Sequence, residues 1–266
     1  MQQRLGAGMD FQTITLDIAY DIAVITLNRP EVMNALNSQM REDITKAVLF
    51  SQDNARVVVL TGAGRSFCSG QDLTDGGAAM IGDMEGTLNN EYVPMLKAIF
   101  DCKVPTISAV NGPAAGAGAN LALAADVVIA SHDAFFLQAF TRIGLIPDAG
   151  GTYWLPRQIG SARAMGAALF ADKISAEQAE EWGMIYEAKP ADAFDAHWRS
   201  RAAHLASGPT ATYAHVKTAI RNSFDNTLND QLALEAKLQG SCGKSHDFSE
   251  GVTAFLEKRP AQFEGR

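Results

Sequence analysis

The chain has 266 residues, of which 47% are hydrophobic and 20% are charged, proportions that exclude a disordered or fibrous protein. Asp and Glu outnumber Lys and Arg by 30 to 22, so the net charge of −8 argues against nucleic acid or an anionic membrane as partner. The three cysteines have no C-x-x-C spacing, which disfavours a disulfide framework or a zinc site. Since no apolar run is long enough for a signal peptide or a membrane span, we expect a cytoplasmic protein.

The N-terminal quarter begins with residues that favour a hairpin and then a helix. Two runs of alternating apolar residues within 13–27 predict two antiparallel strands. Asn37 or Ser38 is then placed to cap an amphipathic helix that extends to about Phe50.

The next segments alternate between strand and helix patterns. Buried strands are predicted at 56–62, 105–110 and 126–130, with a helix near 88–101 and a second helix that opens from the loop at 111–118. Alternation of elements of this length predicts an α/β fold with right-handed crossovers.

The C-terminal part contains helix patterns alone. Three helices are predicted over 209–222, 227–239 and 247–258, and the last carries one apolar stripe, formed by Phe248, Val252, Phe255 and Leu256. We therefore expect an α/β core over residues 10–200 and a helical region over 201–266 that packs on the core, on a neighbouring subunit, or on both.

Glycine-bearing loops follow two of the strands, but neither has the residues of a nucleotide site. The loop from Gly62 lacks the Gly-Lys-Ser/Thr ending of a P-loop. Gly116 and Gly118 would need a third glycine at position 121 for the dinucleotide fingerprint, and that residue is leucine.

The second loop has the composition of a site for a negatively charged oxygen. From Gly112 to Ala119 only Pro113 is larger than alanine, and the run opens directly into a helix. Small side chains let an outside acceptor reach the free N–H groups at a helix N-terminus, which is how an oxyanion hole is built. We expect a second donor from residues 66–72 of the first loop.

Asp148 is a lone carboxylate within the sequence GLIPDAGGT (144–152). Local sequence leaves two interpretations open: a helix N-cap, or a desolvated acid/base with a raised pKa. The five histidines have no ligand spacing, so no metal site is predicted, and the absence of G-x-S-x-G disfavours a serine hydrolase.

Taken together, these segments resemble the crotonase, or enoyl-CoA hydratase/isomerase, superfamily. The matching segments are LNRPEVMNAL (27–36), VVVLTGAGRSFCSGQDL (57–73), ISAVNGPAAGAGANLALAADVVIA (107–130), GLIPDAGGTYWLPRQIG (144–160), SAEQAEEWGMIYEA (175–188) and EGVTAFLEKRPAQF (250–263). The resemblance implies a core of stacked ββα turns with a C-terminal helical appendage, and a homotrimer or a dimer of trimers. It also implies an acyl-CoA thioester as ligand and no separate cofactor, because coenzyme A is part of the substrate.

The resemblance also assigns residues to the thioester site. The backbone amides of Gln71 and Ala117 would donate to the carbonyl oxygen. Ser69, Asp72, Leu73 and Gly116 would line the coenzyme A thioester beside them.

Two departures from the family pattern concern the reaction. Typical hydratases carry glutamates where this chain has Asn120 and Phe140, whereas Asp148 stands where they usually have glycine. Hydration by that route needs both glutamates to position and activate water, so an isomerase that uses Asp148 as its acid/base is expected. The segments are most similar to the branch that converts ring 1,2-epoxyphenylacetyl-CoA to oxepin-CoA in phenylacetate catabolism and also shifts double bonds in enoyl-CoAs.

Other functions remain open on the sequence. One is a different crotonase reaction, either enoyl-CoA hydration or a displacement in which Asp148 is the nucleophile. Another is a catalytically silent acyl-CoA-binding subunit. The acyl pocket is expected to depend on Phe135, Phe136 and Phe140, and the Gly- and Met-rich segment 74–90 is expected to cover its end.

Overall fold

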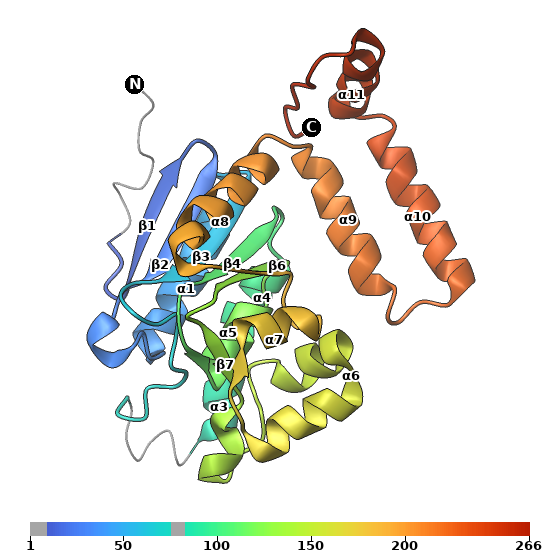
Figure 1. Ribbon diagram of the computed structural model, residues 1–266. Coiled ribbons are helices and arrows are strands. Elements are labelled where there is room, and N and C mark those ends of the chain that lie inside the picture. Colours follow the sequence, from blue (N-terminus) through green and yellow to red (C-terminus); the bar gives the residue numbers. More distant parts are fainter. Residues whose placement is uncertain (1–9, 76–82) are drawn as a thin grey trace.

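The computed structural model describes residues 10–75 and 83–266, which Figure 1 shows. Within them, a large sheet has the strand order β1-β2-β3-β4-β6-β9 and is parallel except for the pair β1–β2. A small sheet has the order β5-β7-β8. The large sheet is built from β1 (Ile14–Ala19), β2 (Ile22–Leu27), β3 (Val57–Gly62), β4 (Thr106–Val110), β6 (Val127–Ser131) and β9 (Glu187–Lys189), and the small sheet from β5 (Ala114–Ala115), β7 (Phe135–Leu137) and β8 (Ile174–Ser175).

The hairpin and the first helix form where local sequence favours them. Tyr20 and Asp21 both adopt positive φ, as a two-residue type I′ turn requires, and they join β1 to β2. Asn37 caps α1 (Ser38–Ser51), because its side chain accepts a hydrogen bond of 2.9 Å from the Met40 N–H. Both predicted elements are confirmed.

Strands of the two sheets alternate with helices along the chain. β4 and β5 precede α5 (Ala117–Leu123), and β6 and β7 precede α6 (Gly151–Phe170). Each of these turns gives one strand to each sheet and then a helix, so the predicted core of stacked ββα turns is confirmed. The remaining helical elements of the core are η1 (Pro30–Val32), α3 (Met84–Thr87), the π-helical turn η2 (Leu88–Tyr92), α4 (Val93–Phe100), η3 (Ala139–Ile143) and α7 (Ala176–Glu181).

The large sheet buries side chains on both of its faces. In β3, Val58 and Leu60 point into the main core, whereas Val57 and Val59 lie on the opposite face beneath α8 (Ala191–Ala206). Trp198 of α8 is packed in that second cluster. Burial on both faces explains why β3 is a continuous apolar run rather than an alternating one.

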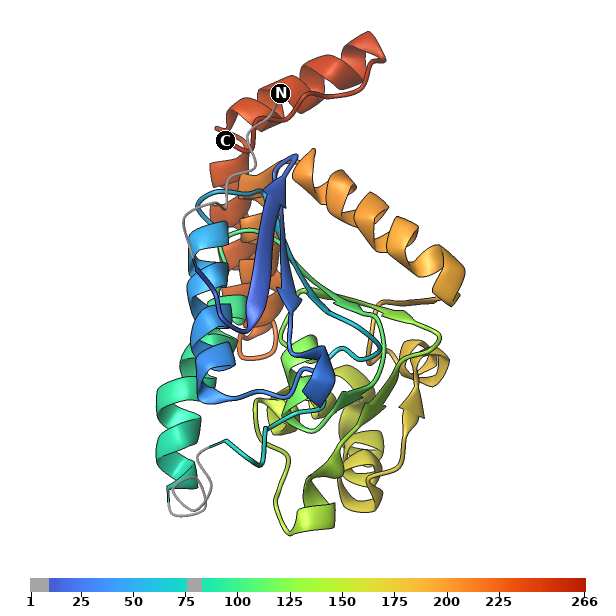
Figure 2. The same cartoon turned by 90° about the vertical axis from the view of Figure 1, so that its left-hand side faces the viewer.

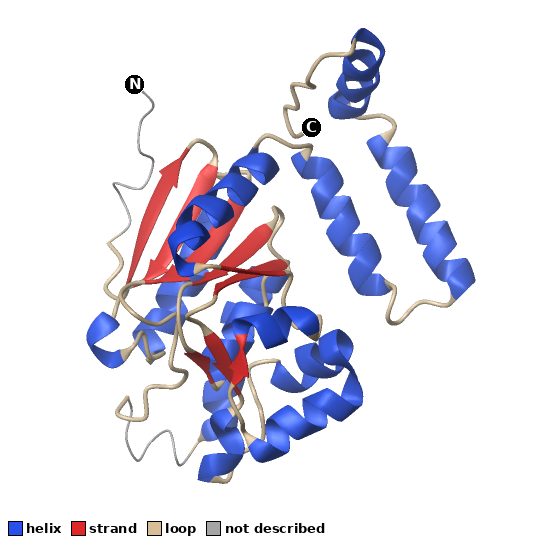
Figure 3. Ribbon diagram, viewed as in Figure 1, coloured by secondary structure: helices blue, strands red, loops and turns tan. Residues whose placement is uncertain are grey.

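Only helices follow α8 (Figure 3), namely α9 (Thr210–Asn222), α10 (Leu228–Cys242) and α11 (His246–Glu257). Charged groups fix α9 to the core. Lys217 Nζ lies 2.8 Å from an Asp126 carboxylate oxygen and donates to the Cys102 carbonyl at 2.6 Å, and Arg221 pairs with the other Asp126 oxygen at 2.6 Å. The predicted C-terminal helical region is therefore present.

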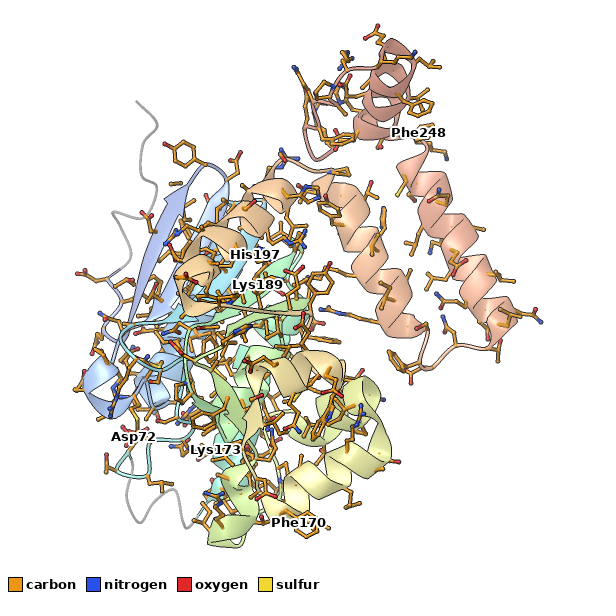
Figure 4. All side chains as sticks on the ribbon, viewed as in Figure 1. Asp72, Phe170, Lys173, Lys189, His197 and Phe248 are labelled. Carbon is orange, nitrogen blue, oxygen red and sulfur yellow. The ribbon has the colours of Figure 1, made fainter. Side chains whose placement is uncertain are left out.

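The core does not cover the apolar stripe of the last helix, α11. α11 stands away from the large sheet in both views (Figures 1 and 2), and Figure 4 shows Phe248 on it. Every side chain of the stripe is at least 44% exposed, the members being Phe248, Val252, Phe255 and Leu256. The described residues of the chain therefore leave this stripe largely uncovered.

The change from core to appendage falls a few residues after position 200. α8 runs through that position without a break and stays packed on the sheet as far as Ala206. The chain leaves the sheet at Ser207 and Gly208, which precede α9. Among the described helices, none is both long enough and apolar enough to cross a membrane.

Candidate active site

Two loops meet at the carboxyl edge of β3 and β4, as loops after neighbouring parallel strands must. The N–H groups of Phe67 and Cys68 donate to the Pro113 carbonyl at 3.1 and 3.3 Å. The Ala115 N–H returns a bond of 3.0 Å to the Cys68 carbonyl. These main-chain bonds hold the loop after β3 against the segment that leads into α5, and the Asn111 side chain adds a bond of 3.1 Å to the Gly64 carbonyl.

Glycines let the two backbones come close enough to act together. Gly70 has φ +96°, and a Cβ atom there would lie 2.8 Å from the Ala115 carbonyl oxygen and 3.3 Å from the Ala117 nitrogen. Gly116 has φ 53° and ψ −128°, a combination that residues with a Cβ avoid. The residues that follow these glycines, Gln71 and Ala117, are therefore neighbours across the loop junction.

The main-chain N–H groups of Gln71 and Ala117 are the predicted oxyanion donors. Both residues line one cavity, and neither N–H donates to an acceptor among the described residues. Two free amides beside a cavity are what a developing negative charge on a carbonyl oxygen requires.

The cavity has a volume of about 470 Å³, within the range of small-molecule sites. Its wall is mostly apolar, with side chains from the loop after β3, from α3 and η2, and from η3 and the loop that follows it. The lining residues are Ser69, Gly70, Gln71, Leu73, Met84, Thr87, Leu88, Tyr92, Gly116, Ala117, Ala139, Phe140, Arg142, Ile143, Leu145 and Asp148.

Asp148 is the one carboxylate in that lining among the residues that the structure describes. Its Oδ1 atom is buried and has no hydrogen-bond partner. Burial raises the pKa of Asp148 to about 6, because the charged form loses its water and gains no cation in exchange. A carboxyl group with such a pKa can both take and return a proton near neutral pH.

Asp148 is not the N-cap of α6. That position belongs to Gly150, which has φ +83° and makes no side-chain cap, and a Cβ there would collide with Trp154. The N-cap interpretation of Asp148 is therefore wrong, because a further turn of the chain separates Asp148 from the first residue of the helix. The acid/base interpretation fits the position that the side chain occupies.

Two buried amide side chains hold the backbone at Asp148. Asn120 Nδ2 donates to the Asp148 carbonyl at 2.7 Å, and Gln138 Nε2 donates to Asn120 Oδ1 at 2.9 Å. A Cβ at Gly151 would lie 2.4 Å from Asn120 Nδ2, so Asn120 packs directly against the start of α6. Asn120 thus positions the loop that carries Asp148 and places an amide, not a carboxylate, beside it.

The structure brings most of the predicted site residues together. Ser69, Leu73 and Gly116 line the cavity beside the two amide donors and Asp148.

Asp72 does not line the cavity. Its carboxylate lies 2.9 Å from Arg29 Nη1 and accepts two hydrogen bonds from Thr74. These bonds from Thr74, together with Arg29, lower the pKa of Asp72. The Asp72 carboxylate, labelled in Figure 4, is therefore engaged by Arg29 and by Thr74 of its own loop.

Of the phenylalanines expected in the acyl pocket, one lines the cavity and two do not. Phe140 lines the cavity, whereas Phe136 is fully buried in the core and Phe135 lies beneath the ammonium group of Lys173, 4.3 Å from it. Of segment 74–90, residues 76–82 lie outside the described residues, and the cavity wall includes Met84, Thr87 and Leu88.

Sequence analysis missed Tyr92 and Arg142, which also line the cavity. Tyr92 lies in the segment near 88–101 that was predicted as a helix and given no further role. Its position beside Asp148 depends on contacts across the fold, which no local pattern records. No group of three or more His, Cys, Asp or Glu side chains among the described residues could hold a metal ion.

Comparison with known proteins places this site in a family. The family model for enoyl-CoA hydratase/isomerase matches residues 17–266. The chain belongs to the enoyl-CoA hydratase/isomerase family, the crotonase family, and is an enzyme that acts on enoyl-CoA thioesters.

Two relatives from the same family carry different names. A protein of Rhodobacter capsulatus named "Probable enoyl-CoA hydratase" is 61% identical over 97% of this chain and all of its own length. The 1,2-epoxyphenylacetyl-CoA isomerase of Escherichia coli is 44% identical over 92% of this chain and 95% of its own length.

The fold agrees with solved structures of the family. The crystal structure of an enoyl-CoA hydratase from Bacillus anthracis superposes with a TM-score of 0.88 and is 31% identical, covering 96% of this chain and 100% of the other.

Proposed function

We propose that the protein is an isomerase of acyl-CoA thioesters that uses Asp148 as its single acid/base. The observation that carries the proposal is the cavity wall itself. It contains two free main-chain amides, from Gln71 and Ala117, and a lone carboxylate whose buried oxygen has no partner. Typical hydratases carry glutamates at two positions where this chain has Asn120 and Phe140.

Isomerisation is the reaction that one carboxyl group can complete alone. The two amides stabilise negative charge on the thioester oxygen, which makes the neighbouring C–H acidic. Asp148 removes that proton and returns it to another carbon, so no atom is added or lost. Addition of water would need a further group to position and activate the water, and the described cavity wall has no second carboxylate.

Within this class, we propose ring 1,2-epoxyphenylacetyl-CoA as the substrate and oxepin-CoA as the product, with double-bond shifts in enoyl-CoAs as a second activity. Support comes from the 44% identical isomerase, which is named for that substrate. It also comes from the apolar wall near Leu88 and Phe140, which suits a ring better than a charged group. The coenzyme A moiety belongs to the substrate, so no separate cofactor takes part in the proposed step.

Hydration is the second candidate, and the 61% identical relative named a hydratase favours it. Displacement with Asp148 as nucleophile would use the same unpaired oxygen, and trapping of a covalent aspartyl adduct with a slow substrate would identify it. A silent acyl-CoA-binding subunit would leave the raised pKa of Asp148 without a use.

We also propose that the protein assembles as a homotrimer or a dimer of trimers. The support is the uncovered apolar stripe of α11, together with exposed Leu228 and Leu232 of α10. Exposed apolar side chains that gather along a helix are typical of an interface.

A panel of acyl-CoAs tests the proposed reaction. Purified protein is incubated with ring 1,2-epoxyphenylacetyl-CoA, a 3-enoyl-CoA and a 2-enoyl-CoA, and products are identified by mass and NMR. The proposal expects products of unchanged mass. A product from the 2-enoyl-CoA that gains one water, with no isomer formed from the other two, would favour hydration instead.

A further inference from the structure

The side chain of Gln71 is fixed by two donors that lie far from it in the sequence. Gln71 Oε1 accepts a hydrogen bond of 2.5 Å from the Tyr92 hydroxyl and another of 2.7 Å from Arg41 Nη1. Its Nε2 atom donates to the Asp72 carbonyl at 3.0 Å. Every polar atom of the Gln71 side chain therefore has a hydrogen-bond partner. Gln71 is also the residue of this loop whose main-chain N–H is a predicted oxyanion donor.

Arg41 is too fully engaged to serve a substrate. It is 1% exposed, although it lies on α1 among apolar neighbours. Besides Gln71, its guanidinium donates to the Leu36 carbonyl at 3.0 Å and to Glu91 at 2.6 and 2.9 Å. A buried charge is tolerated only where its hydrogen bonds are satisfied, and the bond to Gln71 is one of those that satisfy Arg41.

Tyr92 joins this network to the cavity. It is the last residue of the π-helical turn η2, and such turns often occur at functional sites. The Arg41 guanidinium lies 4.8 Å from the centre of its ring. Burial raises the pKa of Tyr92, and the charge of nearby Asp148 raises it further against the opposing effect of Arg41, so the hydroxyl stays protonated and remains a donor.

We propose that Arg41 and Tyr92 are positioning residues that hold Gln71 so that its main-chain N–H points at the thioester oxygen. This inference rests on the proposed function only in that a thioester carbonyl must bind between the two amides. Main-chain bonds to Pro113 and Ala115 hold the earlier residues of this loop, and Leu36 bonds to the main chain of Gly70 and Asp72 at 2.7 and 3.0 Å. Arg41 of α1 and Tyr92 of η2 add the contacts that fix the Gln71 side chain between them. A misplacement of about 1 Å in such a group can cost as much as 10²-fold in rate.

The polarisation of the bound carbonyl reports the position of the donor directly. Infrared or Raman difference spectra are recorded for a bound acyl-CoA thioester labelled with ¹³C at the carbonyl. In the unchanged protein the C=O stretch is expected to move to lower frequency. In Tyr92→Phe, which loses only the hydroxyl, part of that movement is expected to disappear, and kcat to fall about tenfold with KM changed less than twofold.

Two further variants separate positioning from general loss of structure. Gln71→Met keeps the length of the side chain but removes its acceptor for Tyr92 and Arg41 and its donor to the Asp72 carbonyl. Adding Tyr92→Phe to Gln71→Met should therefore have no further effect, because the bond that Tyr92 makes is already lost. Tyr186→Phe, on an exposed tyrosine outside the cavity lining, is the matched control and should leave spectrum and rate unchanged. A thioether analogue of the ligand, which has no carbonyl, should bind all variants equally.

The outcomes are distinct for this inference and for the proposed function. A full frequency shift and full rate in Tyr92→Phe would overturn the inference, even if Gln71→Met failed to fold. A shift that Tyr92→Phe reduces, in a protein that isomerises no acyl-CoA, would support the positioning role and overturn the proposed function.

Discussion

The two sides of the cavity are built in opposite ways. The oxyanion side is main chain, held by hydrogen bonds between two loops and by glycines at positions 70 and 116. The second side, as the proposed reaction would use it, is one side chain of the same lining, Asp148, whose Oδ1 atom is buried and has no hydrogen-bond partner. In the proposed reaction, the first side serves any step that builds charge on a thioester oxygen, whereas the second would determine which proton moves. Damage to the first side therefore needs added bulk, and damage to the second needs only one changed atom.

The largest effect is expected from Asp148→Asn. The amide keeps the shape of the side chain but cannot take a proton, so kcat for isomerisation should fall on the order of 10²–10⁴-fold. Steady-state kinetics with the best substrate of the panel measures it, and coenzyme A binding by calorimetry is the control. Near-normal turnover by a folded Asp148→Asn variant would show that Asp148 is not the acid/base of the reaction.

Ala117→Val breaks the main-chain side by bulk. The N–H remains, but the β-branched side chain enters the space that the thioester oxygen must reach. Since the loss of one such donor costs about 2.7–4 kcal/mol, kcat/KM should fall by about two orders of magnitude or more. Coenzyme A itself, which lacks the carbonyl, should bind as before. Full activity would show that the carbonyl does not lie at the start of α5.

The double variant Asn120→Glu and Phe140→Glu tests whether the cavity lacks only the hydratase carboxylates. We expect no efficient hydration, because Asn120 is fully buried and donates to the Asp148 carbonyl, a bond that a glutamate would lose. Three carboxyl groups near one another would raise one another's pKa values and lower the free energy of unfolding. Fast hydration of crotonyl-CoA by the folded double variant would contradict this.

The smallest effect is that of Asp148→Asn on stability, which we expect to rise although activity falls. Because burial raises the pKa of Asp148 to about 6, the folded protein binds this proton more tightly than the unfolded chain, and stability falls as the pH rises from about 4 to about 6. At pH 8, Asp148→Asn should therefore be more stable than the unchanged protein, by about 1–3 kcal/mol. Urea unfolding at pH 8 and pH 4 measures the difference, which should shrink at the lower pH. A variant less stable at pH 8 would mean that the carboxylate has a favourable partner.

Local sequence was sufficient wherever the determining contacts are local. The positive φ values at Tyr20 and Asp21, the Asn37 cap and the small residues around Ala117 all act within a few positions of the chain. The resemblance to the family added the pairing of Gln71 with Ala117 and the importance of position 148.

The remaining features depend on contacts between distant segments. Gln71 meets Arg41 and Tyr92 across 30 and 21 positions of the sequence, and no periodicity in α1 or η2 marks those contacts. Asp72 is not part of the cavity lining, and its carboxylate pairs with Arg29, which is far from it in the chain. The end of the core followed α8 rather than the last strand, since a helix can stay packed on a sheet after the strands have ended.

Hydrogen exchange at the carbon next to the thioester tests the central claim most directly. An acyl-CoA that cannot isomerise is incubated in deuterated water with the unchanged protein and with Asp148→Asn, and deuterium uptake is followed by NMR. If Asp148 moves this proton, the unchanged protein should catalyse exchange. The exchange rate should fall by at least about 10²-fold in Asp148→Asn, with coenzyme A affinity retained. Binding without exchange in the unchanged protein, or equal exchange in both, would contradict it.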